Sequence, residues 1–327
     1  MEKKYEILST RKLVIGYKKK ELLPPQNLSL YRGEMVCLIG QNGCGKSTLI
    51  RTLSGLQVAI SGDVTIKEKK ISQLNNAAKA KLIGLVLTDS TEIRSLTVRD
   101  MVSMGRFPHT NWFGKLNNKD EDIISQSIEK VHLTNKSDNY FSELSDGEKQ
   151  RTLIAKALAQ DTPIIFLDEP TAHLDLPNKI DIMLLLRHLS NDMQKTILLS
   201  THELELAIQT ADKIWMMQSS GIQKGVPEDM ILENKIQSNF YSKQFSFNNK
   251  TGGFEIKYTG NKTICLNGDD PVLLFWTKRA LLRAGYVLTE DAYTRITVTE
   301  KPEWIIYRDN KTEKRYNIEN LLFTLRQ

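Results

Sequence analysis

A glycine-rich segment between a buried strand and a helix constrains the fold of this chain most. Residues 40–47 read Gly-Gln-Asn-Gly-Cys-Gly-Lys-Ser and fit the pattern G-x-x-x-x-G-K-[ST]. An apolar run at 35–39 precedes them, and helical spacing follows. Glycines let successive N–H groups face a phosphate, and a helix N-terminus adds partial positive charge. The segment therefore predicts a phosphate-binding loop, in which Lys46 reaches the β- and γ-phosphates and Ser47 binds Mg²⁺.

Two further apolar runs end in side chains that suit nucleotide chemistry. Residues 164–167 lead into Asp168 and Glu169, and residues 198–201 lead into His202. Ligands of parallel sheets gather at the carboxyl ends of the strands. We expect Asp168 to hold Mg²⁺, Glu169 to act as general base on the attacking water, and His202 to contact the γ-phosphate. The alternatives are a polar strand end and a structural histidine.

Strand and helix signals alternate through the first part of the chain. The strand-like runs at 164–167 and 196–199, for example, flank a helical segment. This alternation predicts an α/β fold with a mostly parallel sheet covered by helices. Residues 97–143 add several helical segments, which we expect to form a helical subdomain. We assign residues 1–244 to this first domain.

The pattern changes after residue 244. Residues 245–253 turn polar and then glycine-rich, which is typical of a linker or turn. Gly260-Asn261 predicts a hairpin between strands at 254–258 and 263–266. A helix opening at Pro271 and a last helix at 317–325 complete a small α+β domain, assigned to 245–327. Three more strands are expected, at 286–288, 295–299 and 304–307, and Trp276 and Trp304 are expected in the domain core.

Composition limits the setting in which the protein works. No apolar run approaches the roughly 18–20 residues that cross a bilayer, and the first residues lack the apolar core of a signal peptide. We therefore expect a cytoplasmic chain. Cys37, Cys44 and Cys265 lack metal-ligand spacing and fit reduced thiols. The net charge of +6 comes without a long basic block, so we expect no nucleic-acid partner.

Cys44 lies inside the phosphate loop. We expect a small side chain that points away from the nucleotide rather than a redox group. Its place near a helix N-terminus would lower its pKa.

One more segment connects the predicted phosphate loop with the acidic strand end. Residues 144–151 read Leu-Ser-Asp-Gly-Glu-Lys-Gln-Arg. Ser145 and Glu148 form an S-x-x-E capping box, which by itself explains a helix start. Between the phosphate loop and the acidic strand end, however, this segment resembles the signature sequence of ABC transporter ATP-binding subunits. The resemblance covers roughly residues 5–235, and residues 172–175 look like the D-loop of that family.

The resemblance implies an ATPase that works as a pair. Two copies pack head to tail around two ATP molecules, and Ser145 with the Gly147 amide of one copy completes the phosphate site of the other. Membrane permease subunits follow this motion and move a solute. Tyr17 lies where the family stacks an aromatic ring on adenine, although a plain strand-end tyrosine is the alternative. The residues that the resemblance assigns to ATP are Tyr17, Gly40, Gln41, Asn42, Gly43, Cys44, Gly45, Lys46, Ser47, Thr48, Ser145, Gly147 and Asp175.

Three positions depart from the family pattern. Asp146 and Glu148 stand where the signature usually has glycine and glutamine. Thr88 stands about where the family places a glutamine that senses Mg²⁺ and the permease, and the neighbouring Asp89 is a candidate substitute.

Residues 95–108, Ser-Leu-Thr-Val-Arg-Asp-Met-Val-Ser-Met-Gly-Arg-Phe-Pro, narrow the family further. They look like the corresponding stretch in importers of iron chelates, haem and vitamin B12. The resemblance implies an importer ATPase on the inner face of the cell membrane, with permease partners and, indirectly, a solute-binding protein. The alternative is a soluble ABC ATPase that acts on ribosomes or DNA. The single cassette without a long coiled-coil insertion favours transport.

Overall fold

The computed structural model describes residues 5–18, 20–87, 95–110, 114–240, 242–299, 301–309 and 311–326. The chain forms two compact units, Met1–Lys235 and Ile236–Gln327. Among the described residues, we find no helix with the length and apolar character that a membrane span requires.

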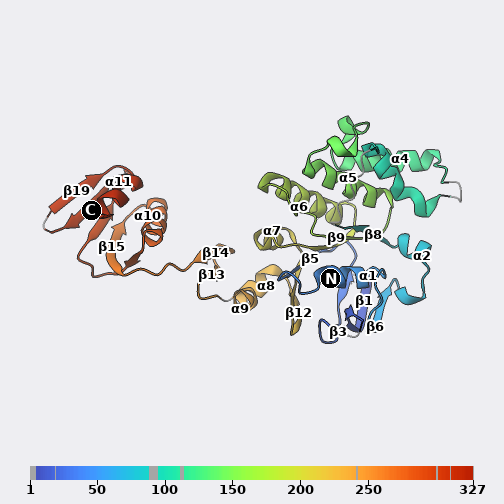
Figure 1. Ribbon diagram of the computed structural model, residues 1–327, viewed down its shortest axis with the longest axis horizontal. Coiled ribbons are helices and arrows are strands. Elements are labelled where there is room, and N and C mark those ends of the chain that lie inside the picture. Colours follow the sequence, from blue (N-terminus) through green and yellow to red (C-terminus); the bar gives the residue numbers. More distant parts are fainter. Residues whose placement is uncertain are drawn as a thin grey trace. The chain divides into compact units, whose positions relative to one another are not determined.

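The first unit is built on a six-stranded sheet (Figure 1). Five of its strands are parallel, and only the edge strand β12 is antiparallel. The expected mostly parallel sheet is therefore confirmed, and the central strands are buried because they are continuous apolar runs. The strand order is β12 (Gly221–Gly225), β11 (Lys213–Gln218), β5 (Met35–Gly40), β10 (Thr196–Ser200), β9 (Ile164–Asp168), β8 (Ile83–Val86).

A second, antiparallel sheet packs against the first. Its order is β4 (Ser29–Tyr31), β1 (Glu6–Val14), β6 (Ser61–Ile66), β7 (Lys69–Lys70), and the short strands β2 (Gly16–Tyr17) and β3 (Lys20–Glu21) pair beside it. One apolar cluster joins the two sheets: it contains Leu8 and Leu30 of the second sheet and Phe166 and Trp215 of the first. Helix α1 (Lys46–Leu53) contributes to the same core and follows the predicted phosphate loop.

The remaining helices of the first unit cover the main sheet or form the helical region seen at the top of Figure 1. They are η1 (Ile71–Gln73), α2 (Asn76–Ala80), α3 (Val98–Ser103), η2 (Met104–His109), α4 (Asn118–Lys130), η3 (Thr134–Lys136), η4 (Phe141–Glu143), α5 (Asp146–Ala159), α6 (Leu176–Asn191), α7 (Leu204–Thr210) and α8 (Pro227–Leu232); the short helix α9 (Lys235–Asn239) begins at the last residue of this unit.

The stretch 95–108 has a packing role that its sequence did not reveal. Arg106 is buried; its Nε donates to Asp120 Oδ1 at 2.8 Å, and its Nη1 donates to the Ala159 carbonyl at 2.8 Å. A Cβ at Gly105 would lie 2.2 Å from the Lys156 carbonyl oxygen, so only glycine permits this approach to α5. The Gly-Arg pair thus fastens η2 to α4 and α5.

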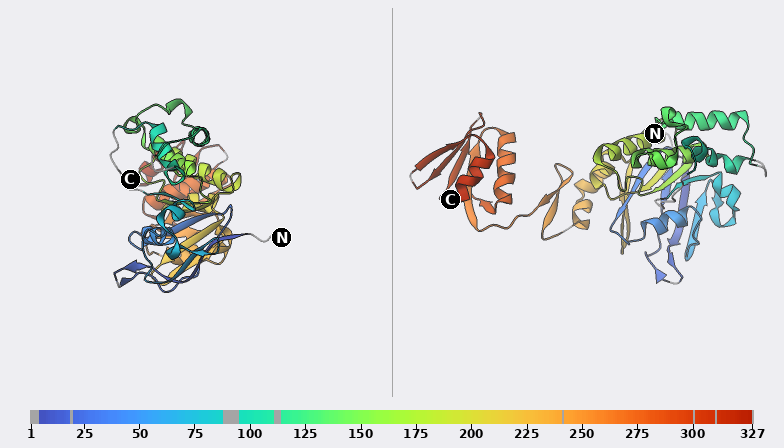
Figure 2. Two further views of the ribbon diagram at one scale, coloured as in Figure 1. Left: turned by 90° about the vertical axis from the view of Figure 1, so that its right-hand side faces the viewer. Right: turned by 45° about the horizontal axis from the view of Figure 1, so that its top comes forward.

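The second unit contains the expected α+β domain. Two helices, α10 (Pro271–Arg283) and α11 (Ile318–Arg326), pack on a five-stranded sheet, and the apolar residues of both elements form one core. The sheet order is β16 (Tyr286–Leu288), β15 (Lys262–Gly268), β17 (Arg295–Val298), β18 (Trp304–Arg308), β19 (Lys311–Arg315). Figure 2 shows the two helices on the same side of this sheet.

The predicted hairpin at Gly260-Asn261 is wrong. Strand β14 (Gly253–Ile256) pairs with β13 (Phe245–Asn248), whereas β15 pairs in parallel with β16 and β17. Gly260 serves a different purpose, because a Cβ there would lie 2.1 Å from the carbonyl oxygen of Gly285.

Only part of the expected linker at 245–253 is a turn. Phe254 makes edge-to-face contacts with Phe240, Phe245 and Phe247, at centroid distances of 5.3, 5.6 and 5.5 Å. These rings supply the apolar contacts that let residues 245–248 form a strand. We call Phe240, Phe245, Phe247 and Phe254 the phenylalanine cluster.

The two tryptophans of the second unit differ. Trp304 is buried as expected, and its Nε1 donates to Thr277 Oγ1 at 2.8 Å. The placement of Trp276 in the core is wrong, since its side chain is 53% exposed. On α10 the buried stripe is Thr277, Ala280 and Leu281, which leaves the preceding position facing solvent.

Candidate functional site

The phosphate loop joins the end of β5 to the start of α1. Gly43 and Gly45 have φ angles of 75° and 108°, in the left-handed region where a side chain is strained. Lys46 is the first residue of α1 and is buried, while Ser47 is exposed. Gln41, Asn42 and Gly43 are also exposed. The loop thus places a helix N-terminus behind exposed backbone, as a phosphate site requires.

Lys46 lies at the meeting point of three strand ends. Its Nζ donates to the carbonyl oxygens of Gly40 at 3.0 Å and Gln41 at 3.4 Å. The same Nζ lies 3.2 Å from His202 Nε2 and 3.8 Å from Glu169 Oε1. Glu169 Oε1 and His202 Nε2 are themselves 2.8 Å apart. Because β5, β10 and β9 are neighbours in the sheet, their carboxyl ends bring these side chains together.

Ser200 bonds both residues at the end of β9, the Asp168 carboxylate and the Glu169 amide, and was not singled out from the sequence. Its hydroxyl donates to Asp168 Oδ1 at 2.6 Å and accepts a bond from the Glu169 amide at 2.9 Å. Glu169 has a φ of 49°, which is uncommon for a residue with a side chain. The Ser200 bond holds the Glu169 amide in this conformation. The position of Ser200 at the end of β10, two residues before His202, is the sequence signal that could have identified this residue.

Tyr17 borders a cavity next to α1. Its ring is about half exposed, and its hydroxyl accepts a bond from Thr48 Oγ1 at 3.0 Å. The cavity has a volume of about 580 Å³. Its lining residues are Gly16, Tyr17, Lys18, Arg51, Leu56, Gln57, Val58 and Leu87. Exposed apolar side chains such as Leu56 and Val58 beside a tyrosine ring suit a flat heterocycle.

Cys44 packs towards the protein interior. It lies against the core cluster of the first unit, and a Cβ at Gly40 would sit 2.7 Å from its Sγ. Burial raises the pKa of the Cys44 thiol, and this outweighs the lowering by Lys46 and by backbone hydrogen bonds. The expected lowering of its pKa at the helix N-terminus is therefore wrong.

The signature segment caps helix α5. Ser145 Oγ accepts a bond from the Glu148 amide at 3.4 Å, and the Ser145 amide donates to Glu148 Oε2 at 3.0 Å. Hydrogen bonds from Lys136 and from the Ser145 amide hold the pKa of Glu148 below its usual range. Asp146 is exposed, and its Oδ1 lies 3.6 Å from Lys149 Nζ. The glutamate that departs from the family pattern thus completes the capping box.

Gly147 and Asp175 meet through Asn178, which the sequence reasoning also missed. Asp175 caps α6, and its Oδ1 accepts bonds from the Asn178 amide at 3.0 Å and from Asn178 Nδ2 at 2.8 Å. A Cβ at Gly147 would lie 2.5 Å from Asn178 Oδ1. The lack of a side chain at position 147 therefore lets α5 approach α6. The three-residue spacing from Asp175 is the helix-cap signal that could have found Asn178.

The chemistry of the nearby oxygens decides whether Mg²⁺ fits here. Among the described residues, no group of three His, Cys, Asp or Glu side chains could hold a metal ion. Mg²⁺ keeps several waters and is usually held by one or two protein oxygens together with substrate phosphates. The Ser47 hydroxyl lies at the end of the phosphate loop, and the Asp168 carboxylate lies at the end of β9. These two oxygens fit that requirement. Thr88 and Asp89 lie outside the described residues.

Comparisons with known proteins identify the two units. Residues 23–172 match the ABC transporter family, and residues 261–326 match the iron ABC transporter C-terminal domain. An uncharacterised ABC transporter ATP-binding protein of Methanocaldococcus jannaschii is 36% identical over 252 residues, covering 77% of this chain and 87% of that protein. The ferric enterobactin transport ATP-binding protein of Escherichia coli is 32% identical over 231 residues, covering 70% and 85%.

Two further comparisons also match proteins of ABC transport systems. The iron(3+)-hydroxamate import ATP-binding protein of Bacillus subtilis is 38% identical over 200 residues, covering 61% of this chain and 74% of that protein. The structure of cbiO1 from Clostridium perfringens, part of the ABC transporter complex cbiONQ, aligns with a TM-score of 0.63 and 27% identity over 72% of this chain and 94% of that one. The chain therefore belongs to the ATP-binding subunits of ABC transporters and carries the C-terminal domain of the iron transporters.

Proposed function

We propose that this protein is the ATP-hydrolysing subunit of an importer for iron chelates. The observation that carries the hydrolytic part is the convergence of Lys46, Glu169 and His202 at three adjacent strand ends. The solute class is supported by the iron-transport C-terminal domain and by relatives named for hydroxamate and enterobactin transport.

ATP occupies the phosphate loop and the cavity beside Tyr17 in this proposal. The loop amides and Lys46 bind the phosphates, and Tyr17 stacks on the adenine. Ser47 and Asp168 hold Mg²⁺, which neutralises charge on the phosphates when bound. Ser200 fixes the Asp168 carboxylate, so it acts as a positioning residue.

Glu169 accepts a proton from the attacking water. In the structure its carboxylate is close to both Lys46 and His202. The γ-phosphate of ATP is a stronger anion and competes for both of these donors. Nucleotide binding therefore frees a Glu169 oxygen for the water, while His202 contacts the phosphate.

A second copy completes the site. Ser145 and the Gly147 amide lie at the N-terminus of α5, where an anion is favoured. We place them, with Asp175, against the nucleotide of the partner copy in a head-to-tail dimer. Permease subunits anchor the pair at the inner face of the cell membrane and receive solute from a solute-binding protein.

Replacement of Glu169 by glutamine tests the catalytic assignment. Glu169→Gln keeps the shape of the side chain but removes the proton acceptor, so we expect intact ATP binding, an ATP-dependent dimer and at least a hundredfold loss of hydrolysis, in line with typical general-base contributions of about 10²–10⁴. Glu228→Gln, at an exposed position of α8, is the matched control and should hydrolyse ATP normally. Normal turnover in Glu169→Gln would refute the assignment.

Purification from membranes tests the transport part. We expect the tagged protein to bring down a permease and to hydrolyse ATP faster when that permease is supplied with a ferric chelate. Association with ribosomes or DNA in place of a permease would favour the non-transport alternative.

A further inference from the structure

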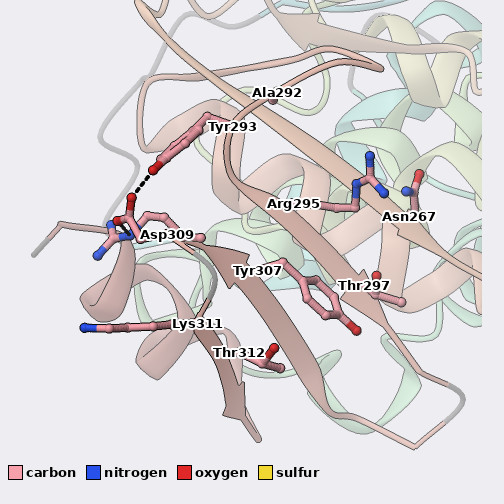
Figure 3. Close-up of a pocket in the computed structure, with 10 residues that line it drawn as sticks. Asn267, Ala292, Tyr293, Arg295, Thr297, Tyr307, Asp309, Lys311 and Thr312 are labelled. Carbon is pink, nitrogen blue, oxygen red and sulfur yellow. Dashed lines mark hydrogen bonds and ion pairs between the residues drawn. The ribbon is translucent and has the colours of Figure 1, made fainter.

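The second unit exposes apolar side chains on one of its helices. On the sheet face that the helices leave open, Arg295 and Thr297 alternate with the buried residues of β17 and border a pocket of about 760 Å³ (Figure 3). Helix α10 instead exposes Val272, Phe275 and Trp276, with 63%, 46% and 53% of each residue accessible to solvent. Apolar groups that gather in one place mark interaction surfaces, whereas single exposed ones need no explanation. The outside of α10 is therefore a candidate contact surface.

The exposed residues of α10 lie along one side of the helix. Positions 272, 275, 276, 279 and 283 recur every three or four residues, so they face away from the buried stripe described above. The rings of Phe275 and Trp276 meet edge to face at 5.4 Å, and the Arg279 guanidinium lies 5.7 Å and 5.4 Å from the two ring centres. These contacts make one continuous surface. We call Val272, Phe275, Trp276, Arg279 and Arg283 the outer stripe.

The two ends of the outer stripe carry opposite charges. At the N-terminal end, Asp269 is exposed, and the next residue, Asp270, caps the helix. At the C-terminal end, Arg279 and Arg283 are exposed. Within the described ranges of the chain, neither Asp269 nor these two arginines form an ion pair. Both ends are therefore open to ion pairs with another molecule.

A stripe with this order of charges is complementary to an antiparallel copy of itself. In an antiparallel pair, Trp276 can lie opposite Val272 of the second copy. Three residues further from this contact, Arg279 then lies opposite the second copy's Asp269. A twofold axis makes both contacts occur twice. A parallel copy would bring like charges together, and like charges across a contact select against that arrangement.

We infer that the outer stripe docks on the outer stripe of a second copy of this chain, with the two α10 helices antiparallel. An anionic membrane surface would match the arginines but repel Asp269, so the presence of both charges favours a second copy over a lipid surface. A single helix pair buries less area than the roughly 1,200 Å² of a stable complex, so the contact is weak by itself. The cassette pair of the proposed function supplies the second copy at high effective concentration, which lets a weak contact form.

Sedimentation equilibrium of the full-length protein without nucleotide tests this contact separately from ATP-dependent pairing. We expect a monomer–dimer equilibrium with a Kd on the order of 0.1–1 mM, as for small interfaces. Trp276→Ala should weaken pairing at least about tenfold, because tryptophans at the centre of a contact carry much of its binding energy. Tyr316→Ala removes an aromatic ring that is 70% exposed outside α10, and it should leave pairing unchanged.

Charge exchange between the two ends tests the antiparallel orientation. Asp269→Lys and Arg279→Glu each place like charges opposite one another, so each variant alone should pair at least about threefold more weakly. An equal mixture of the two variants restores both ion pairs and should associate at least about threefold more tightly than either variant alone. Lys278→Glu makes the same charge change on α10 outside the outer stripe and should pair like the unmodified protein.

Any of three results would overturn the inference. They are a monomeric protein up to about 1 mM, the same effect of Trp276→Ala and Tyr316→Ala, and no gain on mixing the two charge variants. Flotation of the full-length protein with phosphatidylglycerol vesicles, lost in Trp276→Ala and found in place of self-association, would instead assign the stripe to a membrane surface. None of these measurements uses nucleotide, so their outcome is independent of the ATPase assignment, which Glu169→Gln tests.

Discussion

Removal of the Arg106 guanidinium measures how far the helical region depends on one buried ion pair. In Arg106→Met, Asp120 would lose a donor at 2.8 Å, and the buried Ala159 carbonyl would lose another at 2.8 Å. Breaking one side of a buried pair costs about 3–5 kcal/mol. Asp120 keeps its bond from the Asn117 amide, which places the effect at the lower end of that range. We therefore expect the free energy of unfolding of the first unit to fall by about 3 kcal/mol.

A neighbouring pair provides the control. Arg99 bonds to Glu121, one position further along α4, but these side chains are 40% and 44% exposed. Exposed ion pairs contribute about 0–1 kcal/mol, so Arg99→Met should be nearly neutral. The double variant Arg106→Met with Asp120→Asn removes the stranded charge and should recover part of the loss. Urea unfolding followed by helical circular dichroism reports all three. Equal losses in the two single variants would refute the reasoning.

Two more predictions concern the signature segment. Gly147→Ala should lower the urea midpoint, because the added Cβ would lie 2.5 Å from Asn178 Oδ1. Adding Asn178→Ala removes this clash and should raise the midpoint again, since alanine is favoured over glycine in a helix by about 1 kcal/mol. A further drop of the midpoint in the double variant would contradict the prediction. Hydrogen bonds from Lys136 and from the Ser145 amide hold the pKa of Glu148 below its usual value. The ionised Glu148 carboxylate therefore stabilises the folded protein at neutral pH, and this contribution is lost as the pH falls below the usual glutamate range. Glu148→Gln should therefore flatten the decline in stability between about pH 5 and pH 3, measured by urea unfolding, and an unchanged slope would count against it.

The sequence predicted those elements whose local pattern agrees with their surroundings. The buried runs of β5, β9 and β10 are continuous and apolar, so they indicated a parallel sheet without any knowledge of their neighbours. Strand β19 was not predicted, because residues 311–315 read Lys-Thr-Glu-Lys-Arg and show no apolar alternation. A charged edge strand depends on pairing with β18, and charge at an edge also discourages pairing with other chains.

The missed parts of the site depend on contacts between distant segments. Ser200 reaches Asp168, and Gly147 meets Asn178, only after the strands and helices have packed. A single short polar residue shows no periodic pattern, so the sequence does not indicate which distant residue it will contact. The residues that the family pattern identifies could be named from the sequence, whereas the residues that position them required the fold.

The phenylalanine cluster bears on how the protein can be divided. Phe254 is the ring that the other three contact, so Phe240 and residues 242–256 form a small module with apolar contacts of its own, and 249–252 is its turn. A cut inside 245–253, which the composition suggests, would expose these rings to water. A cut after Lys257, whose amide donates to the Gln244 carbonyl at 2.7 Å, keeps the module whole and releases a fragment that still contains the full sheet β15–β19 and both helices. Within the second unit, the point of separation for expression of the sheet and its two helices therefore lies at 258–259, ahead of Gly260, which packs against Gly285.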